Sequence, residues 1–257
     1  MSAPLLEASG LDLRFGAVRA LDGVSLDIHP GEVVAIVGES GSGKSTLLRV
    51  LAGMMAPQAG HVLYRGADGA EHQIGALSEA AKRRLMRSEW GFVHQNARDG
   101  LRMGISAGGN IGERLMAAGG RNYAAIRGAA ADWMARVEMD PARIDEAPRN
   151  FSGGMQQRLQ IARCLVTEPR LVFMDEPTGG LDVSVQARLL DLIRGLVAEL
   201  GLAVFFVTHD IAAARLLAHR IIVMRQGRIV EEGLADRVLD DPRHAYTQLL
   251  VASVLSA

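Results

Sequence analysis

Continuously apolar segments alternate with amphipathic segments along most of the chain. Residues 33–37, 171–174 and 202–207 are unbroken apolar runs, which is typical of strands that are buried on both faces of a parallel sheet. The segments 153–167 and 184–200 instead carry apolar residues at helical spacing. Because strands and helices alternate in this way, we expect a parallel sheet flanked by helices.

Two parts of the chain depart from that alternation. Residues 5–37 are short segments of strand character separated by turns, whereas residues 100 to about 147 have helical patterns broken by Gly and Pro. The sequence therefore predicts an α/β protein with a β-rich beginning and an inserted helical lobe. The expected strands are 11–15, 24–28, 33–37, 60–64, 90–95, 171–174, 202–207, 220–224 and 228–231. The expected helices are 46–53, 78–87, 111–118, 123–137, 153–167, 184–200 and 210–218, followed by two short helices.

Composition narrows the class of protein. Of the 257 residues 49% are hydrophobic, but no apolar stretch reaches the length of a membrane-spanning helix. The N-terminus lacks the basic segment and apolar core of a signal peptide, and the single cysteine, Cys164, cannot form an intrachain disulfide. We therefore expect a cytoplasmic protein with no direct membrane insertion. A net charge of −1 gives no support to nucleic-acid binding.

A glycine-rich turn follows the strand at 33–37 and opens a helix. The turn reads Gly38-Glu39-Ser40-Gly41-Ser42-Gly43-Lys44-Ser45-Thr46. This spacing lets backbone N–H groups turn toward phosphates, with Lys44 reaching the outer phosphates and Ser45 offering a hydroxyl to Mg²⁺. Only two of the 28 cationic residues are lysines, Lys44 and Lys82, and a compact ammonium fits between phosphate oxygens better than a planar guanidinium. The alternative is a glycine-rich turn that binds nothing.

Two carboxylates follow the apolar run at 171–174. Asp175 and Glu176 should lie at the same sheet edge as the glycine-rich turn, because ligands of open α/β sheets bind at the carboxyl ends of the strands. Asp175 can then hold Mg²⁺ through its water shell, and Glu176 can orient and deprotonate a water that attacks the γ-phosphorus. The alternative is an acidic surface turn ended by Pro177.

Two further polar side chains are expected at that edge. His209 follows the strand at 202–207 and is a candidate sensor of the γ-phosphate, although a lone histidine is more often a capping or structural residue. Gln95 follows the strand that begins at Trp90, and its neutral carbonyl oxygen can ligand Mg²⁺. The loop beyond Gln95 is then free to move when the nucleotide changes.

A second anion-binding helix start is predicted at Ser152, Gly153 and Gly154, where a serine cap precedes two glycines. The turn at 38–46 already holds the phosphates from one side. The second helix start can meet the γ-phosphate most simply by coming from another subunit, which predicts a two-fold dimer with two composite sites. The alternative is an ordinary capped helix.

The ordered set of these motifs closely resembles the ATP-binding cassette ATPases over essentially the whole chain. The resemblance implies a P-loop NTPase fold: a RecA-like parallel sheet, an N-terminal antiparallel β-subdomain and an inserted α-helical subdomain. It also implies one domain over residues 4–256, with a core at 4–96 and 159–256 and a helical lobe at about 97–158. Phe151 and Met155 depart from the commoner form of the signature, but the Ser-Gly-Gly core is intact.

The same resemblance assigns roles to individual residues. It implies that Phe15 stacks on adenine and that Glu176 and His209 are catalytic. Asp182 would lie at the dimer seam. The remaining nucleotide-binding residues would be 38–46 together with Ser152, Gly153, Gly154 and Gln156, and the Mg²⁺ ligands would be Ser45, Gln95 and Asp175.

Two subgroups of the family compete. The tail at 241–250 and the run at 181–187 resemble oligopeptide and nickel importer ATPases. Residues 94–102, 106–115 and 178–182 resemble the cassette subunit of the carbon–phosphorus lyase system for phosphonate breakdown. The segment after Gln95 is charged and glycine-rich, which favours soluble lyase core subunits over a membrane coupling helix as partner. We therefore expect a lyase-associated ATPase that forms a homodimer or pairs with a related cassette. An importer ATPase is the alternative, and a module that uses ATP only to dimerise is a weaker one.

Overall fold

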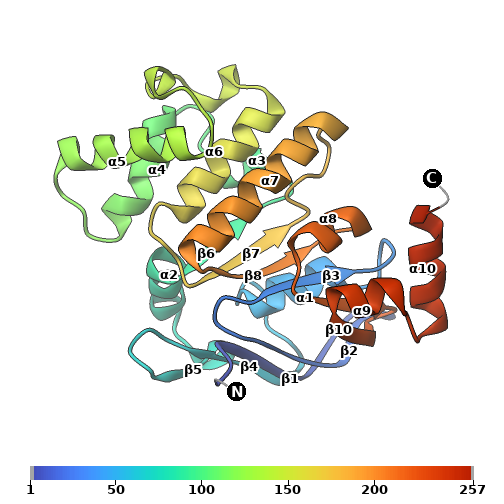
Figure 1. The fold of residues 1–257 in the computed structure, drawn as a ribbon. Helices are drawn as coiled ribbons and strands as arrows, with labels where there is room; N and C mark the ends of the chain where they lie inside the picture. Colours follow the sequence, from blue (N-terminus) through green and yellow to red (C-terminus); the bar gives the residue numbers. More distant parts are fainter. Residues whose placement is uncertain (1–2, 256–257) are drawn as a thin grey trace.

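The computed structural model describes residues 3–255 and contains two sheets with helices packed around them (Figure 1). The larger sheet has the strand order β10-β9-β3-β8-β7-β6. Its strands are β3 (Val33–Val37), β6 (Trp90–Val93), β7 (Leu171–Asp175), β8 (Ala203–Val207), β9 (Arg220–Arg225) and β10 (Arg228–Leu234). All neighbouring pairs are parallel except β9 and β10, which are antiparallel. The predicted parallel sheet is confirmed.

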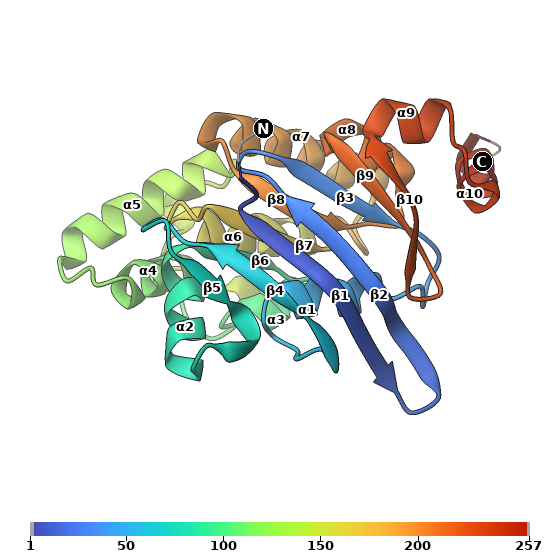
Figure 2. The same cartoon turned by 90° about the horizontal axis from the view of Figure 1, so that it is seen from below.

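The smaller sheet is antiparallel and has the order β2-β1-β4-β5, as Figure 2 shows from below. Its strands are β1 (Leu6–Phe15), β2 (Val18–Ile28), β4 (Ala59–Arg65) and β5 (Glu71–Gln73). The first two strands are longer than predicted. The pairing of β1 with β2 shifts register between Ala8 and Leu11, where Gly10 adopts a φ of 57°. This irregularity breaks the alternation of apolar and polar residues that marks a strand in the sequence.

The helices fall into three groups. α1 (Lys44–Leu51) lies between the two sheets, and its apolar residues belong to the same core cluster as those of β1 and β2. A helical lobe contains α3 (Ala97–Gly100), α4 (Ala107–Ala117), α5 (Tyr123–Arg136) and α6 (Gly153–Leu165). The others are α2 (Glu79–Ser88), α7 (Val183–Leu200), α8 (Ile211–Leu217), α9 (Ala235–Asp240) and α10 (Ala245–Leu255), with short 3-10 turns at Ile74–Ala76, Pro141–Arg143 and Pro148–Asn150. Figure 1 shows α6, α7 and α8 above the larger sheet.

α4 begins four residues earlier than the sequence predicts. Ser106 caps it by accepting a hydrogen bond from the Gly109 N–H. Two glycines in its first turn hide the helical pattern, because glycine is an unfavourable helix residue. At Gly108 a Cβ would lie 2.5 Å from Ile144, so close packing against the loop after α5 explains at least that glycine.

Each strand of the larger sheet contributes to two apolar cores. In β3, Val33, Ala35 and Val37 face one core while Val34 and Ile36 face the other, as the two-residue period of a strand requires. The first core continues without a break into the helical lobe, since it also contains buried residues of α4, α5 and α6. The lobe boundary proposed near residue 158 falls inside α6, which therefore joins the lobe to the sheet. Within residues 3–255, no helix is long and apolar enough to span a bilayer.

Candidate active site

The carboxyl ends of β3, β6, β7 and β8 meet at one edge of the larger sheet. The hairpin that joins β1 and β2 lies beside this edge. A cleft of about 610 Å³ opens there, within the range of small-molecule sites. It is lined by Phe15, Val18, Ala20, Ser40, Gly41, Gly43, Lys44, Ser45, Thr46, Gln95, Glu176 and His209. The fold thus brings together in one cleft most of the residues that were singled out in the sequence.

The turn at residues 38–46, which we call the cradle, needs glycine at two positions. A Cβ on Gly38 would lie 2.1 Å from the Met224 carbonyl oxygen, and one on Gly43 would lie 2.3 Å from the Ala20 carbonyl oxygen. Gly43 also adopts a φ of 106°, which side chains disfavour. The neighbouring strands β2 and β9 therefore press directly on the backbone of the cradle.

Lys44 is 7% exposed, and its ammonium donates 2.8 Å hydrogen bonds to the carbonyls of Gly38 and Glu39. Burial lowers the pKa of Lys44, although the nearby carboxylates of Glu176 and Asp175 oppose that shift. The positive charge is thus held against the backbone of the cradle, next to the start of α1. This is the arrangement that phosphate binding requires.

Ser45 and Asp175 converge beside the cradle. The Ser45 hydroxyl donates a 2.9 Å hydrogen bond to Asp175, which is 6% exposed. The second carboxylate oxygen of Asp175 lies 3.8 Å from the guanidinium of Arg49. A hydroxyl and a carboxylate are oxygen donors of the kind that Mg²⁺ prefers, so this pair fits the predicted cation.

Glu176 lies at the centre of the remaining polar groups. One of its carboxylate oxygens accepts a 3.1 Å hydrogen bond from the amide of Gln95 and lies 3.2 Å from Nδ1 of His209. The residue adopts a φ of 44°, which is uncommon for a glutamate, and its N–H donates to the Val207 carbonyl. Strained backbone of this kind is concentrated at functional sites.

Ser152, Gly153 and Gly154 do not line this cleft. Ser152 caps α6 by accepting a 3.3 Å hydrogen bond from the Met155 N–H, and Ser152 and Gly153 are exposed to solvent. A Cβ on Gly153 would lie 3.6 Å from Leu181, so this helix start lies against the loop that carries Asp182. Asp182 is also exposed and lies outside the cleft. One chain thus presents the cradle in the cleft and these residues outside it.

Gln156 does not suit the nucleotide-binding role that the resemblance implied. Its side chain is 7% exposed and donates hydrogen bonds of 3.0 Å to the carbonyls of Pro148 and Phe151. The amide therefore faces the interior of its own lobe and fixes the loop before α6. No sequence pattern predicts these contacts, because the partners are backbone carbonyls.

Phe15 is 52% exposed at the end of β1, where an apolar ring can meet a base. Val18 and Ala20 of β2 also line the cleft, although nothing in the sequence predicts either as a site residue. Val18 is 65% exposed. Small apolar residues carry no motif, so only the close approach of the hairpin to the cradle identifies them.

The residue before Gln95 is held by α6. The backbone N–H of His94 donates to the Gln160 amide oxygen at 2.8 Å, and the His94 carbonyl accepts from Gln160 and Gln157. Side chains in the middle of α6 therefore hydrogen-bond the residue that follows β6. The start of the same helix carries Ser152 and the two glycines. α6 therefore contacts the residue next to Gln95 directly through two of its side chains.

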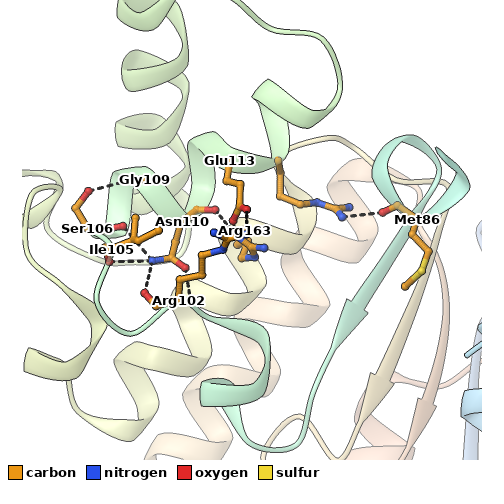
Figure 3. Close-up of polar contacts among 9 residues, drawn as sticks. Met86, Arg102, Ile105, Ser106, Gly109, Asn110, Glu113 and Arg163 are labelled. Atoms are coloured by element: carbon orange, nitrogen blue, oxygen red, sulfur yellow. Dashed lines mark hydrogen bonds and ion pairs between the residues drawn. The ribbon is translucent and has the colours of Figure 1, made fainter. Parts of the chain in front are cut away.

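The segment at residues 96–106, which we call the post-Gln95 segment, is fixed by Asn110. This side chain is fully buried and hydrogen-bonds the backbone of Arg102, Ile105 and Ser106, as Figure 3 shows. Arg102 also pairs with Glu113, which in turn pairs with Arg163 of α6. The loop beyond Gln95 was expected to be free to move, but its second half is tied to α4 and α6.

Comparison with known proteins identifies the class. The family model described as ABC transporter matches residues 21–179. The chain therefore belongs to the ATP-binding cassette (ABC) family, and it is an ATP-binding ATPase of the cassette fold. This confirms the resemblance that was drawn from the motifs.

The chain is similar to ATP-binding proteins of two kinds, named for phosphonates utilization and for peptide import. The chain is 60% identical, over 99% of its own length and 99% of the other's, to the putative phosphonates utilization ATP-binding protein PhnK of Escherichia coli. It is 38% identical to a putative peptide import ATP-binding protein of Brucella melitensis, over 98% of this chain and 78% of that one.

Solved structures give the same fold. A dimeric post-hydrolysis state of the cassette MJ0796 bound to ADP and Pi aligns with a TM-score of 0.78 and 30% identity, covering 90% of this chain and 98% of that one. The cbiO1 protein of Clostridium perfringens aligns with a TM-score of 0.81 and 27% identity, covering 93% and 92% of the two chains.

Proposed function

We propose that this ATPase is a cytoplasmic subunit of a carbon–phosphorus lyase system, where it couples ATP binding and hydrolysis to phosphonate breakdown. The observation that carries the assignment is the 60% identity, over nearly the whole of both chains, to a relative named for phosphonates utilization. Identity to the peptide import relative falls to 38%. The importer function is the second candidate because the alignment with that peptide import relative covers 98% of this chain.

The hydrolytic step rests on Glu176. Its carboxylate lies beside the Gln95 amide and the His209 ring, so it can accept a proton from a water that both neighbours help to place. Lys44 and the N–H groups of the cradle would hold the phosphates of ATP, and Phe15 would stack on the adenine. In this arrangement the side chains orient the water and stabilise charge on the transferred phosphoryl group.

Mg²⁺ would be held by Ser45 and Asp175, with Gln95 adding a neutral oxygen. Among residues 3–255 no cluster of three His, Cys, Asp or Glu side chains forms a metal site. Phosphate oxygens of the substrate are therefore needed to complete the ligand set. When bound, the cation neutralises charge on the phosphate oxygens.

We further propose that the site is completed by a second cassette, either another copy or a related chain. Ser152, Gly153 and Asp182 are exposed and lie outside the cleft that holds the cradle. Val183, next to Asp182, is 82% exposed although it is apolar. An exposed apolar residue beside an exposed anion-binding helix start is expected at a subunit interface.

The soluble lyase core would dock on the post-Gln95 segment. Asn110 and the pair between Arg102 and Glu113 give this segment a fixed shape, while Ile105 remains 40% exposed. A cavity of about 210 Å³ lies between α3, α6 and β6, with Asp99 and Gly100 in its wall. A partner held there would contact the elements that position Gln95.

Copurification tests the assignment. An affinity-tagged chain expressed in cells that carry the lyase genes should recover soluble lyase subunits, and the substitution Arg98→Glu should reduce that recovery because Arg98 is exposed on α3. Arg194→Glu is the matched control, since Arg194 is exposed on α7, away from the post-Gln95 segment. Recovery of integral membrane subunits without lyase subunits would replace this assignment by the importer function.

A further inference from the structure

The C-terminal segment at residues 241–255 has no role in the mechanism above. It contains α10, which Figure 1 shows at the edge of the molecule beside α9. The sequence around Tyr246 resembles that of importer ATPases, which by itself assigns the tail no contact with the site. In the structure Tyr246 is 9% exposed and Thr247 is 1% exposed, so this part of the tail is packed against the body of the protein.

Contacts to β10 fix the start of the tail. The N–H groups of Arg243 and His244 donate hydrogen bonds of 2.8 and 3.0 Å to the two carboxylate oxygens of Glu231. Burial of Glu231 disfavours its charged form and so raises its pKa. Hydrogen bonds from the Arg243 backbone, the Thr247 side chain and the His244 backbone favour the charged form, and together they lower the pKa of Glu231. The ionised carboxylate therefore anchors the turn that precedes α10.

A cation holds the Tyr246 ring. The guanidinium of Arg225 lies 4.8 Å from the ring centroid, within the range of a cation–π contact. Arg225 ends β9, which pairs with β3, the strand that enters the cradle. The Tyr246 N–H also donates to Nδ1 of His244 at 3.1 Å. The position of Tyr246 is thus fixed by a hydrogen bond from its own backbone N–H and by the contact of its ring with Arg225 of the sheet.

The phenol reaches the cradle. The Tyr246 hydroxyl oxygen accepts a 2.8 Å hydrogen bond from the backbone N–H of Glu39. The backbone carbonyl of Glu39 accepts a hydrogen bond from the Lys44 ammonium. Both backbone groups of Glu39 are therefore held, one by the tail and one by the lysine that is expected to meet the outer phosphates.

We propose that Tyr246 is a positioning residue for ATP binding, acting through Glu39 on the cradle; the proposal rests on the cradle being the nucleotide site. The cradle contains Gly41 and Gly43 at positive φ, so its backbone has unusual freedom when it is not held. The tail removes part of that freedom before the nucleotide arrives. A preorganised cradle binds phosphates more tightly because less ordering is left to do.

This role also changes what the tail sequence means. Because Tyr246 contacts the cradle, a tail of this kind serves nucleotide binding whatever the partner is. The resemblance of residues 241–250 to importer ATPases is then no evidence for a membrane partner.

The substitution Tyr246→Phe tests the proposal, because it removes the hydroxyl and keeps the ring under Arg225. Loss of one hydrogen bond should weaken ATP binding about five-fold. The KM for ATP should rise by a similar factor, with kcat at saturating ATP within about two-fold of the wild-type value. Arg225→Gln, which loosens the ring but keeps the hydroxyl, should weaken binding by a smaller factor.

The other two tyrosines of the chain provide matched controls. Tyr64 is fully buried, its hydroxyl donates to Glu89, and it does not line the cleft, so Tyr64→Phe tests the loss of a structural hydroxyl outside the site. Tyr123 is 74% exposed on α5, so Tyr123→Phe tests the substitution alone. Neither control should change the affinity for ATP, measured by titration with fluorescent nucleotide.

Hydrogen exchange gives a second measurement. Tyr246→Phe should speed exchange of the cradle amides in the nucleotide-free protein, and Tyr64→Phe should not. Native ATP affinity and native cradle exchange in Tyr246→Phe would overturn the proposal, as would a lower thermal stability with no change in affinity. If the wild-type chain itself failed to bind ATP at the cradle, the assignment of the nucleotide site would be wrong instead.

Discussion

Glu176 has a positive φ, and its carboxylate contacts two other polar side chains of the cleft. Its φ of 44° points the carboxylate away from the line of β7, toward Gln95 and His209. Asp175, one residue earlier, remains in the strand and faces Ser45. Two adjacent carboxylates thus reach different places, as the roles proposed for Asp175 at the cation and for Glu176 at the attacking water require.

Glu176→Gln should abolish turnover and leave ATP binding intact, because the amide keeps the shape of the side chain but cannot accept the proton. We expect a loss of about 10²-fold or more in steady-state ATPase activity. Glu168→Gln is the matched control: Glu168 also has a positive φ of 47°, but it is exposed and outside the cleft. Unchanged activity in Glu176→Gln would remove Glu176 from its assigned role.

At the scale of elements, α3 and α6 fit together through one glycine. A Cβ on Gly100 would lie 2.2 Å from the amide oxygen of Gln160, a side chain that is 1% exposed and bonded to His94. The glycine therefore leaves room for the amide that holds the residue before Gln95. The hydrogen bonds between Gln160 and His94 therefore depend on the close packing of Gly100 against the Gln160 amide.

Gly100→Ala should displace the Gln160 amide and so loosen His94. We expect a stability loss of about 1–3 kcal/mol in urea unfolding, as for other overpacked sites, together with lower kcat. The double variant Gly100→Ala/Gln160→Ala should lose less stability than the sum of the two single variants, since the added methyl meets no clash once the Gln160 amide is absent. Gly128→Ala, in the exposed face of α5 with nothing within 4 Å, is the control and should be neutral or slightly stabilising. Additive losses in the double variant would contradict this packing.

At the scale of the whole molecule, the cradle and the start of α6 belong to different surfaces. In the proposed composite site they would act on one nucleotide when two chains associate. The solved structure of MJ0796 is dimeric and holds ADP and Pi. The exposed positions of Gly153 and Asp182 are what the same association would require here.

Mixing two inactive variants tests this composite site. Lys44→Ala removes the ammonium of the cradle. Gly153→Asp places a carboxylate where phosphate is expected, at a position where an added Cβ makes only an ordinary contact with Leu181. Each variant alone should be near background, whereas an equal mixture should regain roughly a quarter of wild-type ATPase activity, because half of the dimers contain one intact site. A mixture that stays at background would contradict the composite site; Gly153→Ala is the control for the substitution itself.

The sequence by itself determined the parallel sheet, the cradle and the polar residues at the strand ends. Apolar runs and glycine spacing are local signals, and carboxyl ends of parallel strands share one edge, so the sequence alone predicts that Gln95, Asp175, Glu176 and His209 lie together. The early start of α4 and the bulge in β1 were missed because glycine weakens the local pattern.

The tertiary structure alone decided the contacts between distant segments. The bond from Glu39 to Tyr246 joins residues 207 positions apart, and the bonds from Gln160 to His94 join residues 66 positions apart. The inward turn of Gln156 and the fixed shape given by Asn110 depend on backbone carbonyls. Such partners have no side-chain signature, because every residue carries the same carbonyl group, and only the folded chain selects which one is near.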